Sequence, residues 1–197
     1  MLTVPSPRAN CRSQSTLYGR WSPRLFPIAG VLIAGLFTTF AAAQALHGRV
    51  VGVTDGDTIA VQDSDRLTHK VRLSGIDAPE SRQAFGKRSK ESLSRLVFGK
   101  PVRVAWTKKD RYGRIVGQVW VQPLDCPTCG LTLDANRTQL AVGMAWWFKR
   151  YADEQPLPER LAYEQEELDA RARRVGLWSD PAPIAPWDWR SGVRTGN

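Results

Sequence analysis

The sequence predicts an α+β fold, a small five-stranded Greek-key barrel with about three helices packed on it. Five short segments rich in β-branched residues follow residue 46, and turn residues separate them. One segment with helical spacing lies between the third and fourth of these strands, and two more follow the fifth. The hydrophobic fraction of 42% is sufficient for a core and excludes a disordered chain.

The strands are bounded by polar turns. An Asp55-Gly56 turn follows the first strand, and the polar segment 63–67 follows the second. The fourth strand alternates apolar side chains on one face, and the fifth is an apolar run of strand length. The expected strands are His47–Thr54, Thr58–Gln62, His69–Ser74, Pro101–Thr107 and Ile115–Val121.

Caps and glycines mark the three expected helices. Arg82–Phe98 has apolar residues at helical spacing and stops before Gly99. Asp134–Val142 begins at a capping aspartate, and Glu159–Val175 ends before Gly176. Five strands with an inserted helix suit a small Greek-key barrel, of which the oligonucleotide/oligosaccharide-binding (OB) fold is the best-known example.

Residues 1–45 differ from the rest of the chain. They contain four arginines and no acid, then the apolar run Phe26–Phe40, and they end in Ala43-Gln44-Ala45. These are the three parts of a secretory signal peptide with cleavage after residue 45. An uncleaved signal anchor is the alternative, because Phe26–Ala43 spans 18 mostly apolar residues, near the lower limit for crossing a bilayer. We therefore expect a secreted or periplasmic protein, in contact with a membrane only if this segment is retained.

The chain accordingly divides into three parts. Residues 1–45 form the signal peptide or anchor, 46–180 a globular domain, and 181–197 a tail that contains proline and tryptophan. Whether Trp187 and Trp189 in the tail cover the barrel or stay loose is left open by the sequence.

The charge balance indicates a polyanionic partner. Lys and Arg number 28 against 19 acids, for a net charge of +9, and removal of residues 1–45 leaves +5. Residues 46–115 hold 15 basic and 8 acidic residues, whereas 116–197 hold 9 and 11. The partner surface is therefore expected in the first half of the domain. With only two histidines, a paired-histidine mechanism or a histidine-rich zinc site is disfavoured.

Cysteine usage suggests a local crosslink. Cys11 leaves with the signal segment, and the pair Cys126 and Cys129 remains. In an oxidising compartment such a pair typically forms a disulfide, while a redox-active dithiol or a metal site are the alternatives.

Four short clusters hold the acids and arginines that could carry chemistry. Taken singly, they have structural interpretations: a hairpin turn, a solvated strand position, a capping box at a helix start and a charged hairpin loop. The clusters are Asp55–Thr58, Arg72, Asp77–Glu80 and Asp110–Arg114.

Taken together, these residue types suit phosphodiester hydrolysis. Asp57 and Asp77 offer hard oxygen ligands, which favour Ca²⁺ over zinc in an extracellular setting. Arg72 and Arg114 supply planar forks for bidentate phosphate contact. Glu80 is the natural candidate to take a proton from water or to orient it.

The order and spacing of these clusters resemble the staphylococcal nuclease (thermonuclease) family, in particular its secreted bacterial branch. Later segments, Gly143–Trp147 and Gly176–Trp178, are also similar to that family. The resemblance covers about residues 48–178, and although each motif is weak alone, the ordered set is specific.

The resemblance implies roles for individual residues. Asp57, Asp77 and the carbonyl of Ala78 would bind Ca²⁺. Arg72 and Arg114 would hold the scissile phosphate, and Glu80 would be the general base. Tyr112 would lie beside the bound nucleotide, and Tyr151 is expected at the rim of its pocket. Similar enzymes cut DNA and RNA and leave 3′-phosphates; we expect a monomer.

Three departures from the family pattern stand out. Ala78 replaces a threonine found in some members, 81–86 is shorter than the corresponding loop, and 123–130 lengthens a hairpin. Two rival functions are a catalytically silent nucleic-acid-binding barrel and an extracellular calcium-binding structural domain. The silent module would be free to lose Glu80 or an arginine, and the calcium-binding domain leaves Arg72 and Arg114 without a role.

Overall fold

The computed structural model describes residues 44–192. The predicted signal segment lies almost entirely outside these residues, as does Cys11, so its cleavage stays a prediction. Within the described range, no helix combines the length and apolar character that a membrane span needs.

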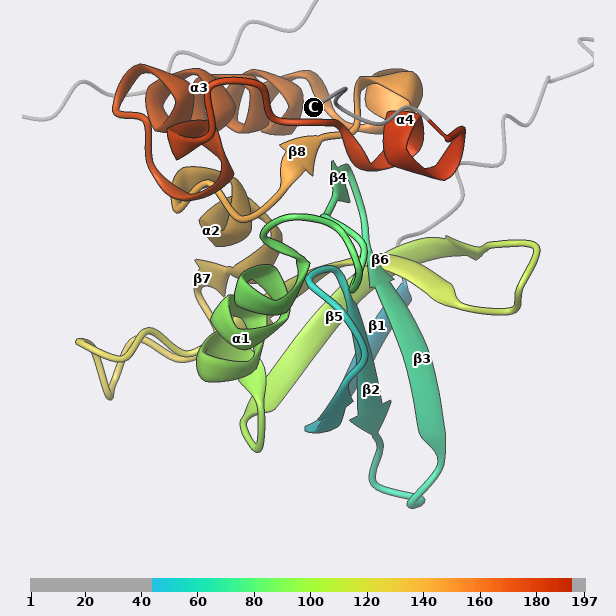
Figure 1. The fold of residues 1–197 in the computed structure, drawn as a ribbon. Coiled ribbons are helices and arrows are strands. Elements are labelled where there is room, and N and C mark those ends of the chain that lie inside the picture. The colour runs from blue at the N-terminus through green and yellow to red at the C-terminus, as the bar shows by residue number, and fades with distance from the viewer. Residues whose placement is uncertain (1–43, 193–197) are drawn as a thin grey trace, which may run out of the picture. The chain divides into compact units, whose positions relative to one another are not determined.

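A closed five-stranded barrel forms the centre of the domain (Figure 1). The strand order is β3-β2-β1-β5-β6, and parallel pairing of β3 with β6 closes the barrel. This confirms the predicted fold class, and two strands have the predicted bounds. The strands are β1 (Gln44–Val53), β2 (Thr58–Gln62), β3 (Thr68–Leu73), β5 (Pro101–Lys109) and β6 (Ile115–Val121).

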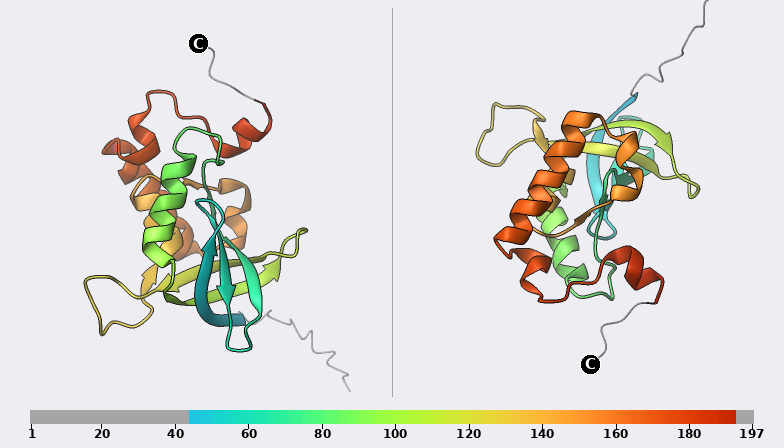
Figure 2. Two further views of the ribbon diagram at one scale, coloured as in Figure 1. Left: turned by 60° about the horizontal axis from the view of Figure 1, so that its bottom comes forward. Right: turned by 90° about the horizontal axis from the view of Figure 1, so that it is seen from above.

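Three helices pack on one end and one side of the barrel (Figures 1 and 2). They are α1 (Gly86–Val97), α2 (Ala135–Ala141) and α3 (Leu157–Ala172). The side chains of Leu93, Leu140 and Tyr163, one from each helix, belong to the same core as the strand valines and are fully buried.

Short elements connect these parts. A two-stranded ribbon joins β4 (Ile76–Asp77) to β8 (Trp146–Trp147), and β7 (Leu133–Asp134) extends the barrel sheet beyond β6. Three further helical turns follow in the second half. They are η1 (Lys149–Glu154), η2 (Gly176–Ser179) and α4 (Pro186–Arg190), which lies in the tail.

The first helix begins four residues later than predicted. Phe85 has a left-handed backbone (φ 66°), and the chain turns there so that Gly86 lies against the carbonyl of Glu80, with no room for a Cβ. The capping-box interpretation of Asp77 and Glu80 is therefore wrong: both residues precede a turn, and the helix starts six residues after Glu80.

The second helix follows its prediction at both ends. Asp134 accepts a hydrogen bond from the Arg137 N–H, and Gly143 follows the helix with φ 65°. The third helix starts two residues earlier than predicted and ends three residues earlier, because Arg174 leaves the helical region with φ 51°.

Asn136 of α2 ties the helix to the barrel. Its side-chain amide is fully buried, donates to the carbonyls of Ser74 (2.9 Å) and Gly117 (3.2 Å), and accepts from the Val119 N–H (3.0 Å). Because Ser74 directly follows β3, these bonds also fix the segment that leads from the barrel to β4. A buried polar network of this kind is favourable only while every partner is present.

We expect Asn136→Ala to lower the free energy of unfolding by about 2–3 kcal/mol, because buried backbone groups lose their partners. Urea unfolding followed by circular dichroism measures this loss. Gln165→Ala on the exposed face of α3 is the matched control and should change stability by less than about 0.5 kcal/mol. Equal effects of the two variants would contradict the bridging role of Asn136.

Candidate active site

Strand register places the first two charged clusters side by side at one end of the barrel. Thr58 at the start of β2 pairs with Arg72 near the end of β3, and the Leu73 N–H donates to the Asp57 carbonyl (2.8 Å). Asp57 therefore sits beside Arg72 although 14 residues separate them in the chain. The antiparallel pairing of two neighbouring strands is sufficient to create this contact.

A single guanidinium joins the two candidate metal-binding carboxylates. Arg72 forms an ion pair with Asp57 and a second one with Asp77 Oδ1 (2.9 Å). The Ala78 N–H donates to Asp57 Oδ2 (2.7 Å), and the Thr58 hydroxyl donates to Asp57 Oδ1 (3.0 Å). The structure thus brings together Asp57, Asp77 and Ala78, as a shared cation site requires.

Burial and charge act in opposite directions on these carboxyl groups. Asp57 and Asp77 are 5% and 1% exposed. Burial opposes ionisation of Asp57, but the charge of Arg72 and the Ala78 N–H outweigh it, so its pKa is lowered. Burial raises the pKa of Asp77, and burial with the negative charge of Asp57 raises the pKa of Asp55 to about 6. The site therefore contains groups that a bound cation would hold in the ionised form.

The donor set fits a hard cation. Among residues 44–192, no cluster of three or more His, Cys, Asp or Glu side chains is arranged as a metal site. A cation at Asp57 and Asp77 would complete its shell with backbone oxygen and water. All these ligands are oxygens, which suits Ca²⁺.

Glu80 lies next to this pair. Its side chain is about two-fifths exposed, and its backbone N–H donates to Gln83 in the turn before α1. Glu80 and the two aspartates line one pocket of about 920 Å³. Because the Glu80 carboxylate is partly exposed, it can contact a water molecule in the pocket.

The β5–β6 hairpin supplies the other predicted residues of this pocket. Arg114 lines it, but its guanidinium pairs with Asp110 (Nε to Oδ2, 2.7 Å) rather than with the central carboxylates. Tyr112 is 66% exposed, and the guanidinium groups of Arg111 and Arg114 lie 4.8 and 5.5 Å from its ring centre. Arg114 and Tyr112 therefore face the pocket from the hairpin side.

Tyr151 in η1 lies on another wall of the same pocket. It is 47% exposed, and the Lys108 ammonium lies 5.3 Å from its ring centre.

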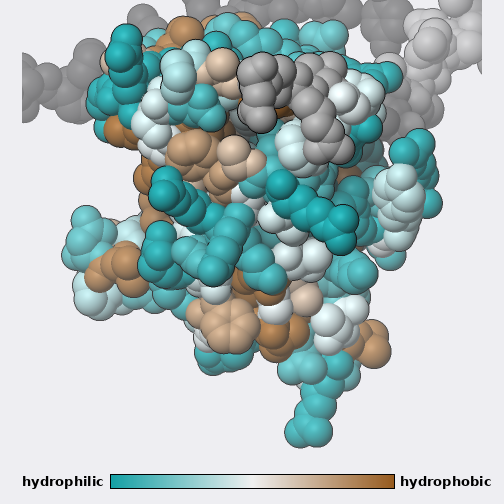
Figure 3. All heavy atoms as spheres, viewed as in Figure 1, coloured by the Kyte–Doolittle hydropathy of each residue, from teal (hydrophilic) through white to brown (hydrophobic). Residues whose placement is uncertain are grey.

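Figure 3 shows that the face drawn in Figure 1 carries mainly hydrophilic side chains, with smaller hydrophobic areas between them. Such a surface suits a polar, charged partner rather than an apolar one.

Comparison with known proteins decides the family. Residues 70–180 match the family described as "Staphylococcal nuclease homologue". The chain belongs to the staphylococcal nuclease family. It is 43% identical to "Protein ParB" of Escherichia coli over 82% of this chain and 89% of that protein. It is 42% identical to "Micrococcal nuclease" of Shigella flexneri over 79% and 86%. An "Uncharacterized endonuclease" of Escherichia coli is 38% identical over 81% and 94%.

This membership makes the chain a thermonuclease-like endonuclease, a phosphodiester hydrolase. The resemblance derived from the ordered clusters is confirmed. The matched region contains β4, the turn that carries Glu80 and the β5–β6 hairpin, all of which line the pocket, whereas Asp57 precedes it. The region ends before α4.

The nuclease pocket also contains Arg190, which the sequence analysis missed. Arg190, at the end of α4, pairs with Asp77 (Nη2 to Oδ2, 2.6 Å) and with Glu80 (Nη1 to Oε1, 2.7 Å). Its sequence signals were a proline at the start of a helical turn and a basic residue at its end. Nothing in the local pattern relates that turn to carboxylates more than 100 positions away.

The remaining aromatic residues of the second half differ in burial. Trp147 and Trp178 are buried, whereas Trp146 and Phe148 are half-buried and Tyr151 is exposed. The two half-buried rings form a wall on which the tail packs.

Cys126 and Cys129 form a disulfide with Cα atoms 5.4 Å apart. Their loop projects from the barrel on the side opposite the β5–β6 hairpin (Figures 1 and 2). This position is remote from the nuclease pocket, which the hairpin borders.

We expect Arg72→Ala to lower the free energy of unfolding by about 3–5 kcal/mol in metal-free buffer, because it removes the cation paired with buried Asp57 and leaves buried Asp77 with Arg190 alone. Arg114→Ala breaks a more exposed ion pair and should cost less than about 1 kcal/mol. Urea unfolding compares the two variants. Should Arg72→Ala fail to fold, Arg72→Lys provides the measurable intermediate loss. Equal stability of Arg72→Ala and the parent would refute the structural importance of this guanidinium.

Proposed function

We propose that this nuclease is a Ca²⁺-dependent phosphodiesterase that hydrolyses DNA and RNA with little sequence preference and leaves 3′-phosphates. The observation that carries the proposal is the convergence of Asp57, Arg72, Asp77 and Glu80 on one pocket that Arg114 also lines. This reaction requires two carboxylates to bind a cation, arginine forks to bind a phosphate and a further carboxylate to activate water.

The residues can divide the reaction as follows. Arg72 and Arg114 bind oxygens of the scissile phosphate and stabilise the charge that develops on them. Glu80 accepts a proton as the water oxygen forms a bond to phosphorus. The bond from phosphorus to the 5′ oxygen breaks, and that oxygen takes a proton from solvent to become the 5′-hydroxyl. The phosphate then stays on the 3′ oxygen. When bound at Asp57, Asp77 and the Ala78 carbonyl, Ca²⁺ supplies additional positive charge to the phosphate.

The surroundings of the pocket support a nucleic acid substrate of little sequence preference. Lys108, Lys109 and Arg111 line the pocket together with exposed Tyr112 and Tyr151. Cationic groups contact the backbone, and aromatic rings stack on any base, so neither selects a sequence. A catalytically silent binding module needs such a surface but no set of carboxylates with arginine forks.

We also propose that the nuclease acts outside the cytoplasm, in a secreted or periplasmic form and as a monomer. The location outside the cytoplasm rests on the basic, apolar and small-residue parts of segment 1–45. If the segment is not cleaved, it would anchor the domain to the membrane with the active site outside the cytoplasm.

We expect Glu80→Gln to reduce kcat by a factor of about 10²–10⁴ with little change in oligonucleotide affinity, because the amide cannot accept the proton. Steady-state cleavage of a fluorogenic oligonucleotide gives kcat, and fluorescence anisotropy gives affinity. Glu91→Gln on the exposed side of α1 is the matched control and should leave both unchanged. A Glu80→Gln protein with parental kcat would remove Glu80 as the base.

We expect Ca²⁺ removal by a chelator to abolish plasmid cleavage and Ca²⁺ addition to restore it. Isothermal titration calorimetry should show one Ca²⁺ site that Asp77→Asn weakens, because that variant loses a charged oxygen ligand. Mass spectrometry of the fragments should find 3′-phosphate ends. Full cleavage in excess chelator, or 5′-phosphate ends, would contradict the proposal.

A further inference from the structure

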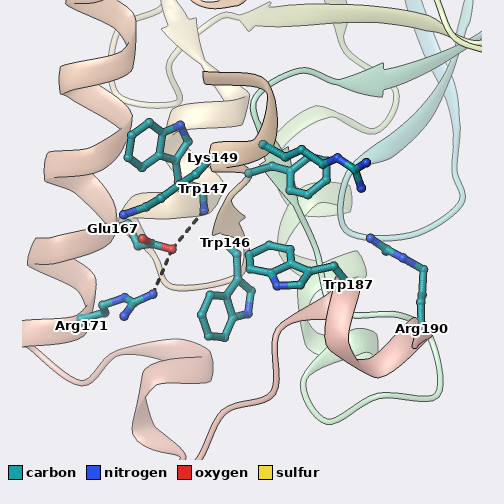
Figure 4. A pocket seen from close by; sticks show the side chains of 9 residues that line it. Trp146, Trp147, Lys149, Glu167, Arg171, Trp187 and Arg190 are labelled. Carbon is teal, nitrogen blue, oxygen red and sulfur yellow. Dashed lines mark hydrogen bonds and ion pairs between the residues drawn. The ribbon is translucent and has the colours of Figure 1, made fainter. Parts of the chain in front are cut away.

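The C-terminal helix α4 (Pro186–Arg190) lies outside the region that matches the family and yet reaches the centre of the pocket. Figure 4 shows Trp187 projecting from α4 beside Trp146, with Arg190 farther along the same helix. The Trp187 ring is stacked on Phe148 (5.5 Å between centres) and meets Trp146 edge to face (5.6 Å). A helix of five residues is not stable alone, so these aromatic contacts hold it in place.

The position of Arg190 differs from that of Arg72. Arg72 is 15% exposed and lies with the buried carboxylates, whereas Arg190 is 44% exposed and contacts Asp77 and Glu80 from the solvent side. A phosphodiester must approach these carboxylates from solvent. It would therefore meet the Arg190 guanidinium before it reaches Asp77.

The contacts of Arg190 also suit a phosphate ligand. Its two terminal nitrogens bond two carboxylates: Nη2 donates to Asp77 Oδ2 (2.6 Å), and Nη1 donates to Glu80 Oε1 (2.7 Å) and more weakly to Asp77 Oδ1 (3.3 Å). The guanidinium has five N–H donors, so it can turn some of them toward phosphate oxygens while keeping one carboxylate. A cation bound at Asp77 would favour this exchange because it competes with Arg190 for the same oxygens.

We propose that Arg190 is a third phosphate-binding arginine of the nuclease, and that Trp187 is the residue that positions it. The proposal rests on the nuclease function proposed above and adds the tail to the substrate site. In this arrangement Arg190 contacts the phosphate from the Glu80 side of the pocket. Arg114 contacts it from the β5–β6 hairpin. Phe148, Arg150 and Arg190 border both the catalytic pocket and a neighbouring cavity of about 630 Å³, of which Trp187 forms a wall (Figure 4).

The decisive experiment compares oligonucleotide binding by full-length proteins in the Glu80→Gln background with Ca²⁺ present, so that the substrate stays intact. Adding Arg190→Ala should weaken binding of a short single-stranded oligonucleotide about tenfold, and Arg190→Lys should give an intermediate loss. The plot of log association constant against log salt concentration should become less steep by about 0.7, the value for one lost phosphate contact on a single strand. Arg95→Ala, an exposed arginine on α1, is the matched control and should leave the slope unchanged.

The anchor is tested in the same assay. Trp187→Ala should reproduce the affinity loss of Arg190→Ala, and Trp187→Phe should recover most of the parental affinity. The double variant should be no weaker than Arg190→Ala alone, because both changes remove the same contact. Full additivity of the two losses would refute a positioning role for Trp187.

Other outcomes separate the competing roles of the tail. Tighter binding or faster cleavage by Arg190→Ala than by the parent would mean that the tail blocks the pocket, and it would overturn the proposal. Unchanged affinity and salt slope would mean a structural ion pair only. If the Glu80→Gln protein itself does not bind the oligonucleotide, the proposed function fails and this proposal fails with it.

Discussion

The contact of one guanidinium with two buried carboxylates is the constraint around which this nuclease is built. Asp57 and Asp77 are almost fully buried, and an unpaired buried carboxylate is very costly in free energy. Arg72 makes the pair tolerable by bonding to both. The backbone N–H of Ala78 contributes a further bond to Asp57, so the two chain segments that carry the acids are held together by hydrogen bonds as well as by charge.

The barrel holds the residues that form this contact in fixed positions. Arg72 and Thr58 are paired across neighbouring antiparallel strands, and Asn136 holds the segment after β3 against α2. Both features belong to the rigid part of the domain, whose core residues are fully buried. A reaction that relies on oriented charges benefits from such a scaffold, because little reorganisation is needed when the substrate arrives.

Around the rigid centre, the pocket takes its other groups from elements that lie outside the barrel wall. Arg114 and Tyr112 come from the β5–β6 hairpin, Glu80 from a turn, and Arg190 from the tail. The tail depends on apolar packing for its place, since Trp187 lies against Phe148 and Trp146. Ion pairs within the pocket and aromatic packing beside it thus both hold α4 in place.

The sequence by itself determined the five barrel strands, the α2 caps and the family, because these follow from local periodicity, turn residues and the order of short motifs. It also singled out Asp57, Arg72, Asp77, Glu80 and Arg114, which line the pocket. Only the tertiary structure decided that Phe85 delays the first helix, that Arg114 pairs with Asp110, and that Arg190 reaches Asp77. Those facts depend on contacts between distant segments, in which side-chain packing and the desolvation of charges outweigh local preference.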